Sequence, residues 1–366
     1  MKNEHGGNIY AENRKNIDIN PSEWLDYSAN INPLGLADSV RNALSGAIDS
    51  VLHYPDTQAH DLKQAISVAY DIPFHQITPG NGAVELFYLL CHVHRPKKVL
   101  ILAPTFSEYE RSARASGAEI IYHYLDQSND FQVSFETLME QFISEKPDLF
   151  FFCNPNNPTG QLVTRQMLRP LIEQAQKQKC LVVVDESFLD FISDPVVSCK
   201  PFLQEFENLL ISHSLTKFYA IPGLRLGFMA ASAALTAKLH EAKDPWNVNS
   251  LAQIAGVAAL SDHVFGEKSK SYIDQEKGRF HQGLCQINGL KPLPPSVNYI
   301  LVNTEAAQLT ASVIAQRLKK EGILIRDCSN YEGLNAYYLR LAVKLAKQND
   351  RLLYFLEKAV KGELHD

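Results

Sequence analysis

The sequence predicts an α/β fold, with a mostly parallel central sheet in a large domain and a smaller α+β domain. Three observations predict this fold. Short apolar runs occur in the middle of the chain, amphipathic segments separate them, and the pattern of apolar residues changes near residue 265. Each run has five or six residues and is dense in Val, Ile, Leu or Phe, which is typical of strands covered on both faces. The runs are Lys98–Ala103, Glu119–Tyr124, Asp148–Cys153, Leu181–Asp185, Asn208–His213 and Leu226–Ala230.

Helix-like segments separate several of these runs: Glu108–Ser116, Ser134–Ser144 and Arg165–Lys179. Strands that alternate with helices indicate a parallel sheet, because each helix carries the chain back to the same edge. In such sheets ligands bind beyond the carboxyl ends of the strands. The polar residues directly after the apolar runs are therefore the candidate site residues.

The length of 366 residues suggests two domains, at about 100–200 residues per domain. After residue 265 we expect a long connecting helix followed by mixed helices and strands. The elements expected from there on, with the helix before them, are 253–260, 265–284, 292–302, 311–321 and 337–342. We expect an N-terminal segment, 1–45, that packs with the small domain, a large domain, 46–270, and a small C-terminal domain, 271–366.

Charge and composition exclude several classes of function. The chain has 35 basic and 41 acidic residues, a net charge of −6, and no basic run, so nothing predicts binding to nucleic acid or to a membrane. No apolar stretch approaches the ~20 residues that span a bilayer. The six cysteines are scattered without metal-ligand spacing, so we expect reduced thiols in a cytoplasmic protein and no metal site.

Four polar motifs follow predicted strands. Thr78–Gly82 is a glycine-flanked turn before a helix and suits a phosphate. Cys153–Gly160 is a polar turn after an apolar strand, and Asp185 is a carboxylate that ends another. Ser214–Lys217 places a lysine beside hydroxyls, and Arg225 follows. A phosphate turn, a buried acid, a lysine and an arginine are together typical of a pyridoxal phosphate site.

These motifs, NNPTG at 156–160, Asp185, and SLTK with Arg225, resemble the fold-type I pyridoxal phosphate enzymes of the aspartate aminotransferase class. The resemblance implies the fold-type I PLP-dependent transferase fold. Two families of this class fit, the histidinol-phosphate aminotransferases and the threonine-phosphate decarboxylases of cobalamin biosynthesis. Finer motifs resemble the decarboxylases. These motifs are His5–Asn8, Tyr27–Gly35, Leu215–Arg225, Pro245–Asn249 and Ile325–Tyr331.

The resemblance implies a role for each residue that contacts the pyridoxal phosphate. Lys217 forms the Schiff base, Asp185 pairs with the pyridine nitrogen, and Asn157 bonds the phenolic oxygen. Phe106 stacks on the ring. Tyr54 reaches the phosphate of a partner subunit, which implies a homodimer with shared active sites. The other phosphate contacts are Gly82, Ala83, Val84, Ser214, Thr216 and Arg225.

The implied substrate is a small phosphorylated amino acid. O-phospho-L-threonine would lose carbon dioxide through the Lys217 Schiff base and a quinonoid, giving (R)-1-amino-2-propanol O-phosphate for the cobalamin nucleotide loop. Arginine forks suit carboxylate or phosphate recognition. The implied substrate contacts are His5, Asn8, Asn32, Asn157, Arg326 and Arg340.

One position departs from the aminotransferase pattern. Aminotransferases of this class usually carry a tyrosine three residues after the buried aspartate, whereas this chain has Phe188, which has no donor. Three alternatives stay open: an O-phospho-L-serine decarboxylase, a histidinol-phosphate-type aminotransferase, and a non-catalytic binding protein of this fold. The sequence does not separate the two decarboxylase substrates, since a pocket discriminates one methylene by only about 1–3 kcal/mol.

Overall fold

The computed structural model describes residues 5–10, 14 and 23–364, and the chain divides into two compact units. The larger unit contains residues 34–157 and 161–270. The smaller unit contains the described residues up to Pro33, the short stretch Pro158–Gly160, and the chain from Ser271 onward. In the predicted segment 1–45, residues 1–4, 11–13 and 15–22 lie outside the described residues. Helix α2 (Asp38–Gly46) belongs to the larger unit, since it packs on helix α10 (Ser250–Ser261).

A seven-stranded sheet forms the centre of the larger unit, in the order β2-β8-β7-β6-β5-β3-β4. The pairs from β7 to β4 are all parallel, and β8 is antiparallel to both of its neighbours. This confirms the predicted α/β fold with a mostly parallel sheet. The strands are β2 (Ile77–Gly80), β3 (Lys98–Ala103), β4 (Glu119–Tyr124), β5 (Leu149–Cys153), β6 (Leu181–Asp185), β7 (Leu209–Ser214) and β8 (Gly227–Ala230).

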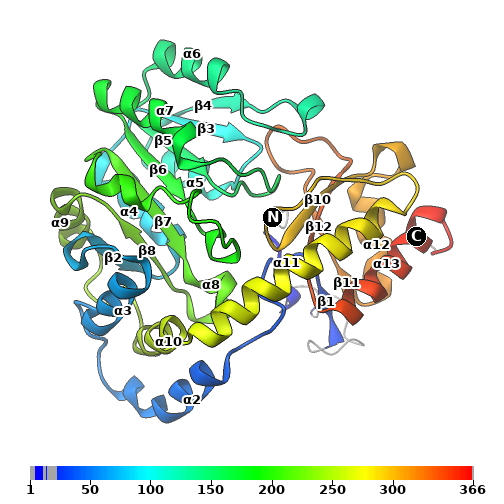
Figure 1. Ribbon diagram of the computed structural model, residues 1–366, viewed down its shortest axis with the longest axis horizontal. Coiled ribbons are helices and arrows are strands. Elements are labelled where there is room, and N and C mark those ends of the chain that lie inside the picture. The colour runs from blue at the N-terminus through cyan, green and yellow to red at the C-terminus, as the bar shows by residue number, and fades with distance from the viewer. Residues whose placement is uncertain (1–4, 11–13, 15–22, 365–366) are drawn as a thin grey trace. The chain divides into compact units, whose positions relative to one another are not determined.

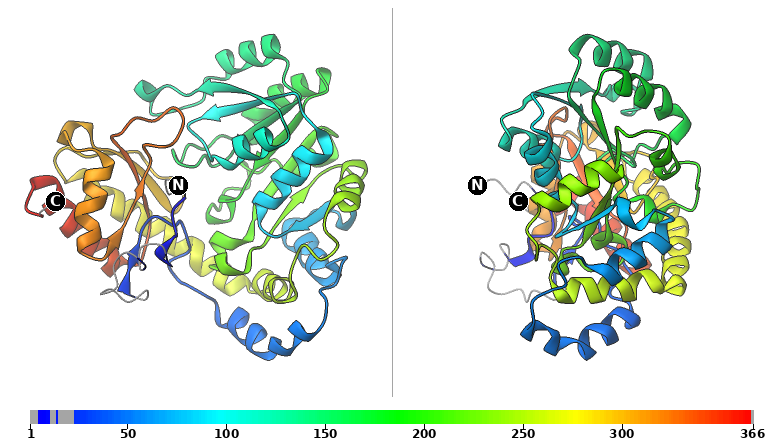
Figure 2. Two further views of the ribbon diagram at one scale, coloured as in Figure 1. Left: turned by 180° about the vertical axis from the view of Figure 1, so that it is seen from behind. Right: turned by 90° about the vertical axis from the view of Figure 1, so that its left-hand side faces the viewer.

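Helices lie on both faces of this sheet (Figures 1 and 2). Strand β5 is buried along its whole length, as expected of a strand covered on both sides. The helices of this unit, besides α2 and α10, are α3 (His60–Tyr70), α4 (Ala83–His94), α5 (Glu108–Ala115), α6 (Phe135–Glu145), α7 (Arg165–Lys177), α8 (Leu215–Phe218) and α9 (Ala233–Ala242). From residue 25 to residue 364, the short 3-10 helices are Ile48–Leu52, Phe74–Gln76 (η3), Gln127–Asn129, Leu189–Phe191, Lys200–Gln204, Pro222–Leu224 and Glu305–Ala307.

Strand β2 contains residues that the sequence indicates as a turn. Its partner is β8, with Pro79 opposite Phe228. Strand β2 is the last strand of the sheet on that side, and an edge strand tolerates a proline because one of its sides needs no N–H donor. The turn itself is therefore only Asn81–Gly82, and α4 begins directly after it.

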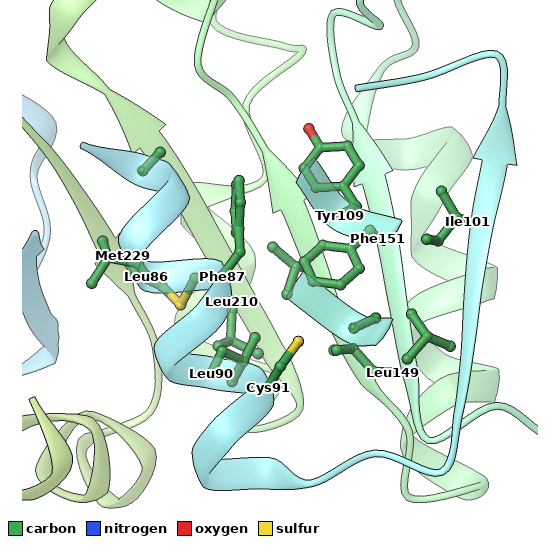
Figure 3. Close-up of a cluster of buried hydrophobic side chains, with 14 of the residues drawn as sticks. Leu86, Phe87, Leu90, Cys91, Ile101, Tyr109, Leu149, Phe151, Leu210 and Met229 are labelled. Atoms are coloured by element: carbon green, nitrogen blue, oxygen red, sulfur yellow. The ribbon is translucent and has the colours of Figure 1, made fainter. Parts of the chain in front are cut away.

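A hydrophobic cluster fills the space between the sheet and helices α4 and α5 (Figure 3). Phe87 of α4 and Tyr109 of α5 both contact Phe151 of β5, with ring centroids 5.6 and 5.0 Å away. Tyr109 lies at one end of this cluster, and its hydroxyl points away from the other labelled side chains (Figure 3). The apolar packing thus fixes the ring of Tyr109 and leaves its hydroxyl available to a polar partner.

The smaller unit contains a four-stranded antiparallel sheet, β12-β13-β10-β9, and a parallel pair, β1 with β11. Its helices α12 and α13 pack on each other. Helix α11 belongs to the larger unit up to Lys270 and to the smaller unit from Ser271. The elements are β1 (Leu25–Asp26), α11 (His263–Cys285), β9 (Lys291–Pro292), β10 (Tyr299–Asn303), α12 (Ala311–Lys320), β11 (Ile323–Leu324), β12 (Arg326–Asp327), β13 (Tyr338–Ala342) and α13 (Ala346–Lys361).

All six cysteines are free, and five of them are buried, so they act mainly as core residues. Among the residues that the structure describes, no helix is long and apolar enough to cross a membrane. In the same described ranges, no group of three or more His, Cys, Asp or Glu side chains is placed to hold a metal ion.

Candidate active site

The carboxyl ends of β5, β6 and β7 bring the predicted catalytic motifs into one row. Cys153 pairs with Asp185, and Asp185 pairs with Ser212, in the parallel register. Side chains alternate between the two faces along a strand, so Ser212 and Ser214 share a face of β7. Asp185, Ser214 and the helix that carries Lys217 therefore all belong to one edge of the sheet in the larger unit.

The Asp185 carboxyl is 4 % exposed and accepts three hydrogen bonds. The Tyr109 hydroxyl donates to Oδ2 at 2.5 Å. Ser187 donates to Oδ1 from its backbone N–H at 3.0 Å and from its hydroxyl at 2.6 Å. Asp185 is thus a buried carboxyl whose orientation is fixed by three donors, which suits pairing with a cationic ring nitrogen.

Burial, together with the nearby Asp185 charge, raises the pKa of Tyr109 well above its usual value. The phenol therefore keeps its proton and remains a donor to Asp185. We expect Tyr109→Phe to lower the free energy of unfolding by about 1.5–3 kcal/mol, because a buried hydrogen bond to a charged group is lost. Chemical denaturation measures this, with Tyr88→Phe, at a far more exposed tyrosine, as the control. Equal unfolding free energies for the two variants would contradict this role.

Lys217 lies in the short helix α8, directly after β7. Its Nζ is 5.0 Å from the centroid of the Phe188 ring, within cation–π range. Phe188 is the residue that replaces the tyrosine expected in an aminotransferase. The ring thus contacts the lysine amine through its face and offers it no hydroxyl.

A cradle for a phosphate lies at the start of α4. Its first N–H groups have no partners within the helix, and a helix N-terminus carries partial positive charge. Gly82 has a φ of +81°, and a Cβ there would collide with the Arg225 guanidinium. A Cβ on Gly227 would come within 2.7 Å of the Ala83 nitrogen. The two glycines therefore keep the backbone N–H groups and Arg225 close together.

Two hydroxyls follow the same strand end. Ser214 Oγ caps α8 and lies 2.8 Å from Thr216 Oγ1. With Ala83, Val84 and Arg225, the larger unit presents N–H, hydroxyl and guanidinium donors, which is the donor set that a phosphate ester requires. The residues present fit a cofactor with a phosphate group and a protonated ring nitrogen.

Three other predicted cofactor residues belong to the same unit. Phe106 packs edge-on against Tyr109, at 5.6 Å between ring centroids. Asn157 is buried; beside it the Asn156 amide donates to the Pro104 carbonyl at 3.0 Å. Tyr54 is 82 % exposed, and its ring lies 5.0 Å from that of Trp246.

The opposite face of β7 carries a different polar group. His213 alternates with Ser212 and Ser214, so it points to the other side of the sheet. Its Nε2 is 2.8 Å from Asp190 Oδ2, which also accepts from Tyr70 at 2.9 Å. Burial would raise the pKa of Asp190, but His213 beside it brings the pKa below its usual value. This pair fixes the strand beneath the site.

The smaller unit contains a polar pocket, called the anion pocket below after the arginine that lines it. His5, Asn8 and Arg326 line it, together with Ser28 and Asn330. Arg326 pairs with Arg340 across the β12–β13 ladder, so both guanidinium groups are on one face of the sheet. They are 7 % and 5 % exposed. Two buried cations side by side favour an anionic ligand between or beside them.

Ser28 holds this pocket together. Its hydroxyl accepts a hydrogen bond from the Gly7 N–H at 2.8 Å, and its carbonyl accepts one from Arg340 at 2.8 Å. A Cβ on Gly6 would collide with that same carbonyl. Gly7 has a φ of +83°, which favours glycine. The turn His5–Asn8 is therefore packed against the segment that carries Ser28. Asn32 and Arg340, also predicted here, are buried but do not line the pocket.

Sequence reasoning missed several residues that shape these sites. Tyr109 was part of a predicted helix, and no motif marked it, because its contact with Asp185 joins segments distant in the sequence. Ser187 follows Asp185 by two residues, the spacing of an Asx turn. No sequence pattern pointed to the role of Ser28 in the pocket, since its contacts come from segments distant in the sequence.

The sequence pattern of the family described as aminotransferase class I and II matches residues 22–356. The chain therefore belongs to this family, whose fold-type I architecture it shares. It is 37 % identical to the threonine-phosphate decarboxylase of Salmonella typhimurium, over 98 % of this chain and 97 % of that protein.

Two solved structures are also similar. The histidinol-phosphate aminotransferase of Clostridium acetobutylicum superimposes with a TM-score of 0.86 at 30 % identity, covering 92 % of this chain and 99 % of that one. The L-threonine-O-3-phosphate decarboxylase of Porphyromonas gingivalis gives 0.81 at 25 % identity, with the same coverage. The chain is thus related to both families that its motifs resemble.

Proposed function

We propose that this protein is a pyridoxal phosphate-dependent decarboxylase of O-phospho-L-threonine in cobalamin biosynthesis. The observation that carries the proposal is the buried Asp185, with its three donors, on the same sheet edge as Lys217 and the phosphate cradle. The similarity to the Salmonella typhimurium decarboxylase over nearly the whole chain supports it.

Pyridoxal phosphate, when bound, supplies an aldehyde that condenses with amines and a ring that accepts the electrons released as carbon dioxide leaves. Asp185 would hold the proton on the ring nitrogen, because its carboxyl is buried and held in place by hydrogen bonds from Tyr109 and Ser187. This pairing keeps the ring able to accept electrons. Asn157 would bond the ring's phenolic oxygen, and Phe106 would cover one face of the ring.

Lys217 would act twice. Its amine would first hold the cofactor covalently and then release it to the amine of the substrate. The freed Lys217 Nζ would deliver a proton to the substrate Cα after carbon dioxide has left. The ring of Phe188, 5.0 Å from this nitrogen, excludes water from one side of it.

The phosphate of the cofactor would lie at the start of α4, on the N–H groups of Ala83 and Val84, with Arg225 beside it. Tyr54 would complete this site in a partner subunit, which makes the protein a homodimer. The exposure of Tyr54, at 82 % within one chain, supports a role at a subunit interface.

The anion pocket of the smaller unit would bind the acidic groups of the substrate. His5, Asn8 and Arg326 would hold its phosphate, and Arg340 a carboxylate or phosphate oxygen. The bond at the substrate Cα that breaks is the one held perpendicular to the cofactor ring, so these contacts would select decarboxylation by positioning the substrate.

A histidinol-phosphate-type aminotransferase is the second candidate, because the Clostridium acetobutylicum structure superimposes with a higher TM-score, 0.86, than the decarboxylase structure, 0.81. An O-phospho-L-serine decarboxylase is a close variant of the first. Carbon dioxide release from each phosphorylated amino acid, measured without any keto acid, tests the proposal. Release from O-phospho-L-threonine supports it; turnover of histidinol phosphate that requires a keto acid, with no carbon dioxide, would favour the aminotransferase.

The turn His5–Asn8, which contains Gly6 and Gly7, gives a separate prediction. We expect Gly6→Ala to raise KM for O-phospho-L-threonine about tenfold, because the added methyl collides with the Ser28 carbonyl and forced overpacking costs about 1–3 kcal/mol. Cofactor absorbance should stay unchanged. Gly46→Ala, at a position with open space around it, is the control. An unchanged KM in Gly6→Ala would remove the turn from the substrate site.

A further inference from the structure

A further pocket lies on the larger unit, where α3, α9 and the short helix η3 pack together. It encloses about 660 Å³ and is open to solvent. None of its lining residues belongs to the cofactor cradle or to the anion pocket of the smaller unit. The ionisable residues that line it are Lys63, His75, His240, Glu241 and Lys243.

Lys63 is the unusual member of this set. It lies on the buried face of α3, beside Leu62 and Ile66, and is only 6 % exposed. Its Nζ is 4.3 Å from the centroid of the Phe74 ring. Within the described ranges the ammonium makes no hydrogen bond and no ion pair. An ammonium has three donors, and those of Lys63 face a pocket that is open to solvent, where a ligand can accept from them.

The electrostatic surroundings do not compensate for this burial. Burial lowers the pKa of Lys63, and the positive charge of Lys243 lowers it further. Lys243 itself donates to the Thr57 carbonyl at 3.3 Å and to Asn247 Oδ1 at 3.1 Å. Among the lining residues Glu241 is the one acidic side chain. The charge of Lys243 is also offset by the nearby Glu85, Asp244 and Asp56, so Lys63 is the cation of this pocket with the least compensation.

We propose that this pocket is a binding site for a small phosphorylated molecule, whose phosphate accepts hydrogen bonds from Lys63. A lysine binds phosphate as a compact point charge with three donors, and Lys63 has no other acceptor for them among the described residues. Ala233, Ala237 and Pro245 give the pocket an apolar wall, which suits the organic part of such a ligand. The site is separate from the chemistry proposed above.

Ligand binding here has a consequence for stability. A ligand that binds only the folded chain stabilises it in proportion to RT ln(1 + [L]/Kd). Without ligand, the buried charge of Lys63 opposes folding, so Lys63→Met should raise the melting temperature of the ligand-free holoenzyme. Methionine keeps the length and packing of the side chain and removes the charge.

The test is equilibrium dialysis of the pyridoxal phosphate-loaded holoenzyme with radiolabelled inorganic phosphate and glycerol 3-phosphate. Lys63→Met is compared with Lys238→Met, which removes an exposed lysine from α9 and does not line the pocket. We expect Lys63→Met to bind one phosphate fewer per chain, or to bind it at least tenfold more weakly. Lys63→Arg should retain the site. Acetate at equal ionic strength should not compete.

Equal binding by Lys63→Met and Lys238→Met would overturn the proposal. A second measurement uses the unmodified protein and needs no folded variant. Trace acetylation followed by peptide mass spectrometry compares the reactivity of Lys63 and Lys238. Phosphate should slow acetylation of Lys63 severalfold and leave Lys238 unchanged, and equal reactivity of Lys63 with and without phosphate would also overturn the proposal.

Discussion

Replacing Lys217 by alanine is expected to abolish carbon dioxide release from O-phospho-L-threonine, by about 10⁴-fold or more. The change removes both the amine that holds the cofactor and the group that delivers a proton to the substrate Cα, and proton transfer alone contributes about 10²–10⁴-fold. Lys238→Ala, at an exposed lysine of the same unit, should retain full activity. Single-turnover release of carbon dioxide measures the effect.

Mass spectrometry after borohydride reduction provides a second readout. In the unmodified protein the mass of the cofactor should be found on the peptide that contains Lys217, and in Lys217→Ala on no lysine peptide. Retained activity in Lys217→Ala, or a cofactor attached at another lysine, would contradict the assignment.

Asp185→Asn is expected to lower kcat on the order of 10²-fold and to weaken cofactor binding. The amide has the size of the carboxyl, so the packing around it stays, but its charge and its pairing with a ring-nitrogen proton are lost. Tyr109 and Ser187 would also face an amide in place of an anion, and mispaired buried donors cost about 1–3 kcal/mol each. Steady-state kinetics with saturating cofactor measure the effect.

The control for this variant is Asp194→Asn, which changes an exposed aspartate in the loop after β6. It should have the activity of the unmodified protein. If Asp185→Asn retained kcat and differed only in stability, Asp185 would be a residue of the core and not of the chemistry.

Most of the larger unit's sheet could be predicted from its apolar runs, because strands buried on both faces have few polar residues. Strands β3, β4 and β6 begin and end at the predicted residues. Helix α2 was not predicted, since Val40 alone among its side chains is buried and its apolar pattern is weak. Strand β2 was missed because Pro79 and Gly80 are typical of turns, and its place at the sheet edge is a tertiary property.

The motifs of the cofactor site could be predicted because each is a short contiguous segment at a strand end. Contacts between segments that are distant in the sequence could not be predicted. Tyr109 and Asp185 are 76 residues apart, and Ser28 meets Arg340 across 312 residues. No sequence motif marked Lys63 as a candidate binding residue, because its burial depends on how α3 packs in the folded chain. Asn32 is buried as the substrate site requires, yet the structure does not place it on the anion pocket.

The most direct test of the proposed reaction is product analysis after incubation of the holoenzyme with O-phospho-L-threonine in deuterated water, without a keto acid. A decarboxylase that protonates the substrate Cα should give carbon dioxide and 1-amino-2-propanol O-phosphate in equal amounts, with one deuterium on the carbon that carried the carboxylate. A keto acid product without carbon dioxide would contradict the decarboxylase assignment and favour the aminotransferase.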